Sequence, residues 1–134
     1  MFKLIKILNS GVNVPEPVVI DKPDYLPVQR GAILRLSGGH VVNCDKSTKP
    51  EYIAFADAPV GATKVTCYAV TSSMLFETVI NAPAEEFKVG YKVVFALDSD
   101  DVAFGVDSDT TNGVARIVDL MGAKEIGDKV TITF

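Results

Sequence analysis

From residue 31 onward, the sequence consists of short stretches of β-branched and aromatic residues separated by turn-forming residues. The stretches cover residues 32–36, 40–44, 52–55, 64–70, 74–80, 92–97, 114–118 and 129–134. Such side chains favour strands, and the Gly, Pro, Asn and Asp residues between them favour tight turns. Helix has room for only one short turn over residues 82–87, with Asn81 placed to cap it. We therefore expect an all-β fold, a single small β-barrel or β-sandwich of short antiparallel strands.

Glycine recurs directly before three of the expected strands. The order apolar residue, Gly, any residue, Lys, Val occurs at residues 89–93 and again at 126–130, and a looser version places Gly31 before the strand at 32–36. Glycine adopts positive φ angles at no steric cost and allows a sheet to bend sharply. We expect Gly31, Gly90 and Gly127 to form strand-entry turns of a barrel.

The first 29 residues differ from the rest. Residues 1–8 favour a strand, because two lysines interrupt an apolar stretch that is too short for a signal peptide. Four of the seven prolines then fall within residues 15–27, and proline disfavours both helix and internal strand pairing. We expect an extended proline-rich N-terminal arm, residues 1–29, followed by a β-barrel domain, residues 30–134. The arm either packs along its own domain or reaches a neighbouring surface.

If the arm reaches a neighbouring surface, its basic, aromatic and proline side chains are the candidate contacts. These residues are Phe2, Lys3, Lys6, Pro15, Pro17, Pro23, Tyr25 and Pro27.

Length and charge limit the partners. A chain of 134 residues is long enough to fold as one domain without disulfides or a metal. Thirteen basic and seventeen acidic residues give a net charge of −4, which argues against nucleic acid, and no stretch is long enough to span a membrane. Residues 1–50 carry +3 and residues 51–134 carry −7. The basic end of one molecule is thus suited to the acidic face of another, unless the split is incidental.

The residue types used in catalysis do not form a recognisable motif. The one histidine, His40, lies at an expected turn, where a local hydrogen bond is the ordinary role. Cys44 and Cys67 match no metal or redox spacing, and they are either buried thiols or a single disulfide. We expect no enzyme, and no catalytic, cofactor-binding or metal-binding residues.

Five aspartates, at positions 98, 100, 101, 107 and 109, lie within twelve residues. Facing acidic turns can supply calcium ligands. However, aspartate is also common in β-turns because it binds its own backbone. Solvated loops are the favoured interpretation, and calcium binding is the alternative.

The order of these segments resembles a known family. A proline-containing segment leads to Gly31-Ala32-Ile33-Leu34 and the turn 37–39, then to the segments 49–53, 57–59 and 89–93, and residues 127–134 follow. This order resembles the small β-barrel decoration, or head-stabilisation, proteins of tailed bacteriophages. The resemblance implies a homo-oligomer, a trimer in many members, made in the host cytoplasm. It also implies that this oligomer binds the major capsid protein on the outer capsid surface through its arm.

Two other functions fit the same features. One is another virion component, such as a head-fibre base or a tail module. The other is a cellular β-barrel that binds a small ligand, for which we would expect one well-formed pocket near Tyr52, Tyr68 or Tyr91.

Overall fold

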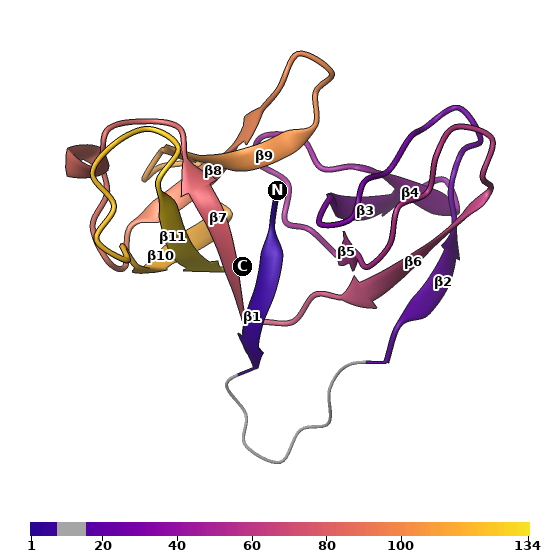
Figure 1. Ribbon diagram of the computed structural model, residues 1–134, viewed down its shortest axis with the longest axis horizontal. Helices are drawn as coiled ribbons and strands as arrows, with labels where there is room; N and C mark the ends of the chain where they lie inside the picture. Colours follow the sequence, from indigo (N-terminus) through magenta and orange to yellow (C-terminus); the bar gives the residue numbers. More distant parts are fainter. Residues whose placement is uncertain (8–15) are drawn as a thin grey trace.

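The computed structural model describes residues 1–7 and 16–134, apart from the side chain of Lys6. The described part of the chain is almost entirely β, as the sequence predicts (Figure 1). The elements in chain order are β1 (Lys3–Ile7), β2 (Val18–Asp21), β3 (Ile33–Ser37), β4 (His40–Asn43), β5 (Tyr52–Ala54), β6 (Lys64–Ala69), β7 (Met74–Ile80), the 3-10 turn η1 (Ala84–Glu86), β8 (Lys92–Leu97), β9 (Ala103–Ser108), β10 (Ala115–Asp119) and β11 (Lys129–Thr133).

Five strands close into a barrel. Their order is β7-β11-β10-β8-β9, and β9 returns to β7 through the pairs Val79↔Gly105 and Ile80↔Val106. This closing pairing is parallel, whereas the other pairings in the barrel are antiparallel, as expected. β1 lies on the same edge of β7 as β9 but pairs with the first half of the strand. β7 is therefore long enough to hold both the closing strand and the N-terminal strand.

A second five-stranded sheet lies beside the barrel (Figure 1). Its order is β2-β6-β5-β3-β4, all antiparallel, and β2 approaches β4 across the open side. The sequence predicts the strands of this sheet from residue 33 onward, but not their separation from the barrel.

Each sheet has its own apolar core. The barrel encloses an aromatic cluster of Phe2, Phe76, Phe95 and Phe134. The core of the second sheet consists of smaller side chains, which are Val28, Ala32, Leu34, Val41, Ala54, Ala58, Val65 and Cys67. Cys44 belongs to the barrel cluster and Cys67 to the other, and both thiols are free. The disulfide alternative is therefore wrong, and the buried-thiol alternative is confirmed.

The described parts of the first 29 residues pack along their own domain. β1 pairs with β7, β2 pairs with β6, and Val28 forms a bridge with Ala58. Strands from before and after residue 29 thus share each of the two sheets. The expected arm is in this part of the chain a component of both sheets, because the backbone of β1 pairs with the first half of β7 and the backbone of β2 pairs with the open edge of β6.

Local geometry agrees with most of the predicted turns. Gly31, Gly90 and Gly127 all have positive φ angles, of 88°, 88° and 95°, as expected for strand-entry turns. The predicted helical turn is only the short η1. Asn81 does not cap it, because the Asn81 side-chain amide donates instead to the Asp107 carboxylate at 3.2 Å.

Candidate interaction surface

The one histidine makes a local contact within its own turn. His40 Nδ1 lies 3.0 Å from the carbonyl oxygen of Gly38, which is the local contact that the sequence predicts for a turn histidine. In residues 1–7 and 16–134, no group of three or more His, Cys, Asp or Glu side chains is placed to hold a metal ion. None of the described residues belongs to a helix with the length and apolar character needed to cross a membrane.

Burial keeps both cysteine thiols protonated. Burial in the barrel core raises the pKa of Cys44 to about 12, and burial in the second sheet raises that of Cys67 to about 11. Both groups are therefore protonated near neutral pH, and a protonated thiol is a poor nucleophile and metal ligand.

The aspartates of the two acidic turns bind their own backbone. Asp98 Oδ1 accepts hydrogen bonds from the amides of Asp100 and Val102, at 2.8 and 3.0 Å. Asp109 Oδ1 accepts from the amides of Thr111 and Asn112, and these bonds hold the Asp109 pKa below its ordinary range. The interpretation of these aspartates as turn-forming residues is confirmed at both positions.

The eight predicted contact residues differ in their exposure in the structure. Lys3, Pro17, Tyr25 and Pro27 are exposed, as a contact surface requires. Pro15 and the side chain of Lys6 lie outside the described residues.

Phe2 and Pro23 are buried, so the prediction that they contact a partner is wrong. The Phe2 ring packs edge-on against Phe95, with centroids 5.6 Å apart, because the barrel core admits another aromatic ring. The carbonyl of Pro23 accepts a hydrogen bond from the buried Lys22 ammonium at 2.9 Å, which turns this proline inward.

A groove of about 290 Å³ runs between β1 and the second sheet, and we call it the β1 groove. Its lining includes Lys3 and Leu4 from β1, and Arg30, Phe55 and Tyr68 from the other side. Phe55 and Tyr68 form an edge-to-face pair with ring centroids 4.9 Å apart. The Arg30 guanidinium lies 5.8 Å from the centroid of the Phe55 ring, a cation–π arrangement that orients the charge.

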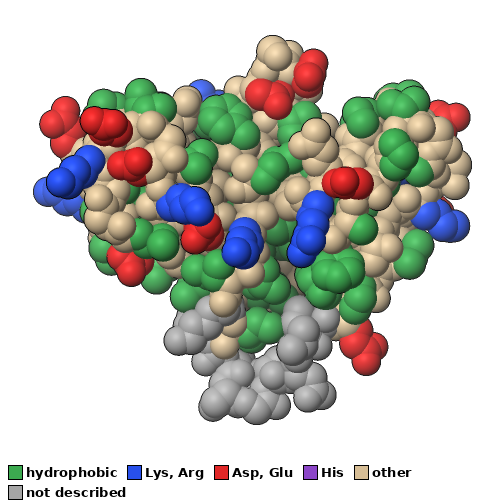
Figure 2. Space-filling view, viewed as in Figure 1, with side chains coloured by type: hydrophobic (Ala, Val, Ile, Leu, Met, Phe, Trp, Pro, Cys, Tyr) green, Lys and Arg blue, Asp and Glu red, His purple; other side chains and the backbone are tan. Residues whose placement is uncertain are grey.

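Basic side chains continue from this groove across the barrel. Lys3 lies opposite Glu77 in the β1–β7 pairing, and the Glu77 carboxylate forms an ion pair with Lys129 at 3.3 Å. Figure 2 shows Lys and Arg side chains spread across the middle of this face of the molecule. Because Glu77 is paired with Lys129 and Lys3 belongs to no ion pair found in the described residues, the surface beside the groove carries a positive charge.

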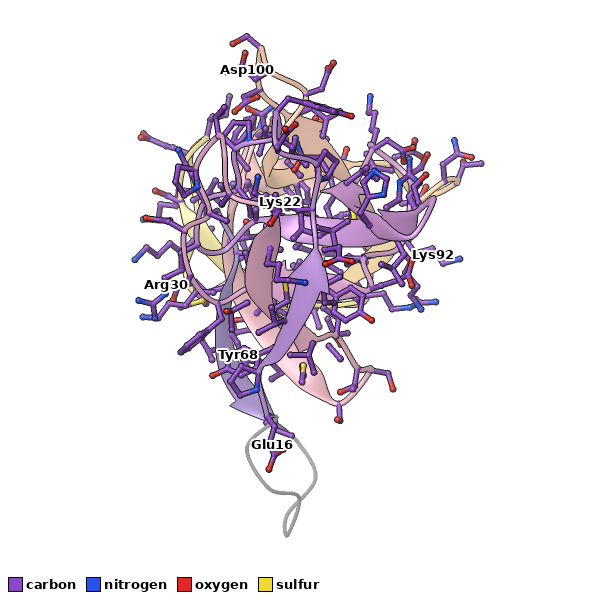
Figure 3. The ribbon with its side chains drawn as sticks, turned by 90° about the vertical axis from the view of Figure 1, so that its right-hand side faces the viewer. Glu16, Lys22, Arg30, Tyr68, Lys92 and Asp100 are labelled. Atoms are coloured by element: carbon purple, nitrogen blue, oxygen red, sulfur yellow. The ribbon has the colours of Figure 1, made fainter. Side chains whose placement is uncertain are left out.

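The turn between β8 and β9, residues 98–102, carries the opposite charge, and we call it the acidic hairpin. Its tip is rigid because Asp98 binds two amides and the Asp98 amide in turn donates to the Val102 carbonyl at 2.9 Å. The side chains of Asp100 and Asp101 are exposed. Figure 3 shows Asp100 at the end of the molecule, away from Arg30.

A second basic cleft lies on the side opposite Arg30. Its lining includes Lys49, Lys92 and Arg116, and its volume is about 490 Å³. Figure 3 shows Arg30 and Lys92 on opposite sides. Sequence reasoning missed both basic surfaces, because their residues come from distant segments. For the β1 groove, the one available signal was the excess of basic residues before position 51.

The comparisons with known proteins bear on the fold. No protein-family model matches the sequence, and no curated protein matches it. Among solved structures, the chain is similar to the head fiber gp8.5 N base of bacteriophage phi29, with a TM-score of 0.53 and 19% sequence identity. The match covers 89% of this chain and 94% of that chain. The two proteins therefore share a fold over nearly their whole lengths.

Proposed function

We propose that this protein is a structural component of a tailed-phage virion that binds the outer surface of the head and stabilises it. The observation that carries the proposal is the near full-length fold similarity to a phage head-fibre base. The resemblance of the sequence to phage decoration proteins points in the same direction. The proposed partners are the major capsid protein and other copies of this chain in a homo-oligomer, with a trimer as the expected form.

The surface of the protein supports an interaction role more than a catalytic or ligand-binding one. Tyr68 lines an open groove between two sheets rather than an enclosed pocket, which gives a small-ligand-binding barrel less support. The buried thiols and the turn-bound aspartates leave little chemistry for an enzyme. The stabilising mechanism would be mass action, because a protein that binds only the expanded shell favours that shell.

Co-sedimentation with the capsid tests the proposal. Purified protein is mixed with expanded capsids assembled without it, and we expect it to sediment with them. Failure of the intact protein to bind its cognate capsid would overturn the proposal. Deleting residues 1–29 is a poor test of the contact surface, because it also removes β1, β2 and the core residue Phe2.

Single substitutions test the contact surface instead. Tyr25 is 73% exposed, and exposed aromatic residues are frequent anchors of interfaces. We expect Tyr25→Asp to weaken capsid binding by about tenfold or more. Ile126→Asp is the control, because Ile126 is also exposed, at 62%, but lies in the turn before β11. Equal binding by the two variants would contradict a role for Tyr25 in the contact.

The alternative of a head-fibre base is favoured by the name of the structural neighbour. The two functions predict different effects on the capsid. A decoration protein raises the temperature at which capsids rupture, whereas a fibre base binds without this effect and carries a further fibre segment. Calorimetry of capsids with and without the protein separates them.

A further inference from the structure

Two exposed cations, Lys3 and Arg30, line the β1 groove. The ion pairs found in residues 1–7 and 16–134 are Lys64 with Asp21 and Lys129 with Glu77. Neither pair includes Lys3 or Arg30. Arg30 is held over the Phe55 ring, and a guanidinium stacked on an aromatic ring keeps its donors free for a carboxylate.

The acidic hairpin holds the matching opposite charge. Asp98 is committed to backbone amides, but Asp100 and Asp101 point into solvent and take part in neither of those two ion pairs. Asp101 has a φ angle of 59°, which together with the Asp98 hydrogen bonds fixes the shape of the tip. A preorganised tip loses little conformational entropy when it docks.

The hairpin cannot reach the groove of its own chain. It projects from the top of the molecule, beyond the first strand (Figure 1), and Arg30 lies lower on another side (Figure 3). An acidic hairpin that enters the groove must therefore belong to another molecule, and each further copy of this chain presents a rigid pair of carboxylates there.

We propose that the acidic hairpin of one copy docks in the β1 groove of a second copy, with Asp100 and Asp101 facing Lys3 and Arg30. This inference rests on the homo-oligomer of the proposed function and names the surfaces that form it. The opposite basic cleft is less suited, because the Arg116 guanidinium already donates to the Gly90 carbonyl at 3.2 Å. An arginine–carboxylate contact in the groove gains strength from the charge of both partners.

The interface joins two different surfaces, so it is heterologous. Every copy carries one hairpin and one groove, and the assembly therefore closes into a ring or grows as a chain. Because exposed charges contribute, added salt weakens it.

Light scattering at low ionic strength, about 0.05 M, tests the interface. We expect wild-type protein to have a mass above the 14.4 kDa of one chain. We expect the hairpin variant Asp100→Asn/Asp101→Asn and the groove variant Lys3→Gln/Arg30→Gln each to be monomeric. Mixing the two variants restores one intact hairpin and one intact groove per pair, so a dimer of about twice 14.4 kDa forms and grows no further. The control is Glu85→Gln/Glu86→Gln, which removes two exposed charges from η1 and leaves the wild-type mass.

Three results would overturn the inference. They are a monomeric wild-type protein, an unchanged mass in either double variant with native circular dichroism, and a mixture of variants that stays monomeric. Capsid co-sedimentation of the same samples separates this inference from the proposed function. A monomeric wild type that binds capsids overturns only the hairpin–groove interface, whereas an oligomer that ignores capsids overturns only the virion role.

Discussion

Phe2 joins the N-terminal segment to the barrel core. Its side chain is only 3% exposed and packs against Phe95 and Phe134. Removing a buried phenylalanine ring loses its transfer free energy and leaves a cavity. We therefore expect Phe2→Ala to lower the free energy of unfolding by about 3–5 kcal/mol, measured by denaturant titration.

Tyr25→Ala is the matched control for this prediction. Tyr25 is an aromatic residue of the same N-terminal segment but is exposed, so we expect a change within about 0.5 kcal/mol. Similar stabilities of the two variants would mean that Phe2 does not anchor the segment in the core.

Asp128 makes the stability contributed by the turn before β11 depend on pH. Its Oδ2 accepts hydrogen bonds from the amides of Lys124 and Glu125, at 2.8 and 3.0 Å. These bonds, with that from Glu125 the larger contribution, hold the Asp128 pKa below its ordinary value of 3.8. A carboxyl whose pKa is lower in the folded state stabilises the protein above the unfolded pKa. This stabilisation is lost as the pH falls through the folded value.

Asp128→Asn keeps an acceptor oxygen but removes the charge. We expect its thermal midpoint to fall less than that of the wild type between about pH 5 and about pH 2. Asp100→Asn serves as the control, since the Asp100 carboxylate accepts none of the side-chain hydrogen bonds found in the described residues. Parallel pH profiles for wild type and Asp128→Asn would refute the assigned role.

The closure of the barrel depends on a close approach between β7 and β9. A Cβ atom added at Gly105 would lie 2.5 Å from the Val79 carbonyl oxygen, which is a backbone atom that cannot move aside. We expect Gly105→Ala to destabilise the protein by about 1–3 kcal/mol in denaturant unfolding. Ser108→Ala, in the same strand, adds no atom and should have a smaller effect. Wild-type stability of Gly105→Ala would show that β9 does not close the barrel in this way.

The strands that sequence reasoning missed are those specified by distant partners. β9 has the sequence Ala-Phe-Gly-Val-Asp-Ser, which lacks a run of β-branched residues, and its position is fixed by β7 and β8. β2 lies among prolines that argue against a strand, but its pairing with β6 requires only one partner strand. The other strands carry their own β-branched or aromatic pattern and were predicted from it.

The candidate surface was predictable only in part. The acidic turn at residues 98–101 and the charge split are visible in the sequence. The β1 groove is not, because Lys3, Arg30 and Phe55 meet only after the two sheets have formed. Phe2 was assigned to a partner because its position near the N-terminus gave no indication of the core cavity that it fills.

At the scale of the whole molecule, the N-terminal segment ties the two sheets together. It contributes β1 to the barrel sheet and β2 to the second sheet. The β1 groove and the acidic hairpin are the charged surfaces that we propose for assembly (Figures 1 and 2). These surfaces are suited to contacts with other proteins, which is the role proposed here on the virion head.

Cryo-electron microscopy of virions from the genome that encodes this chain tests the virion role most directly. The account predicts density on the outer surface of the head that fits the barrel and the second sheet, with several copies in contact. Heads that lack this density, in virions whose protein content excludes the chain, would contradict it.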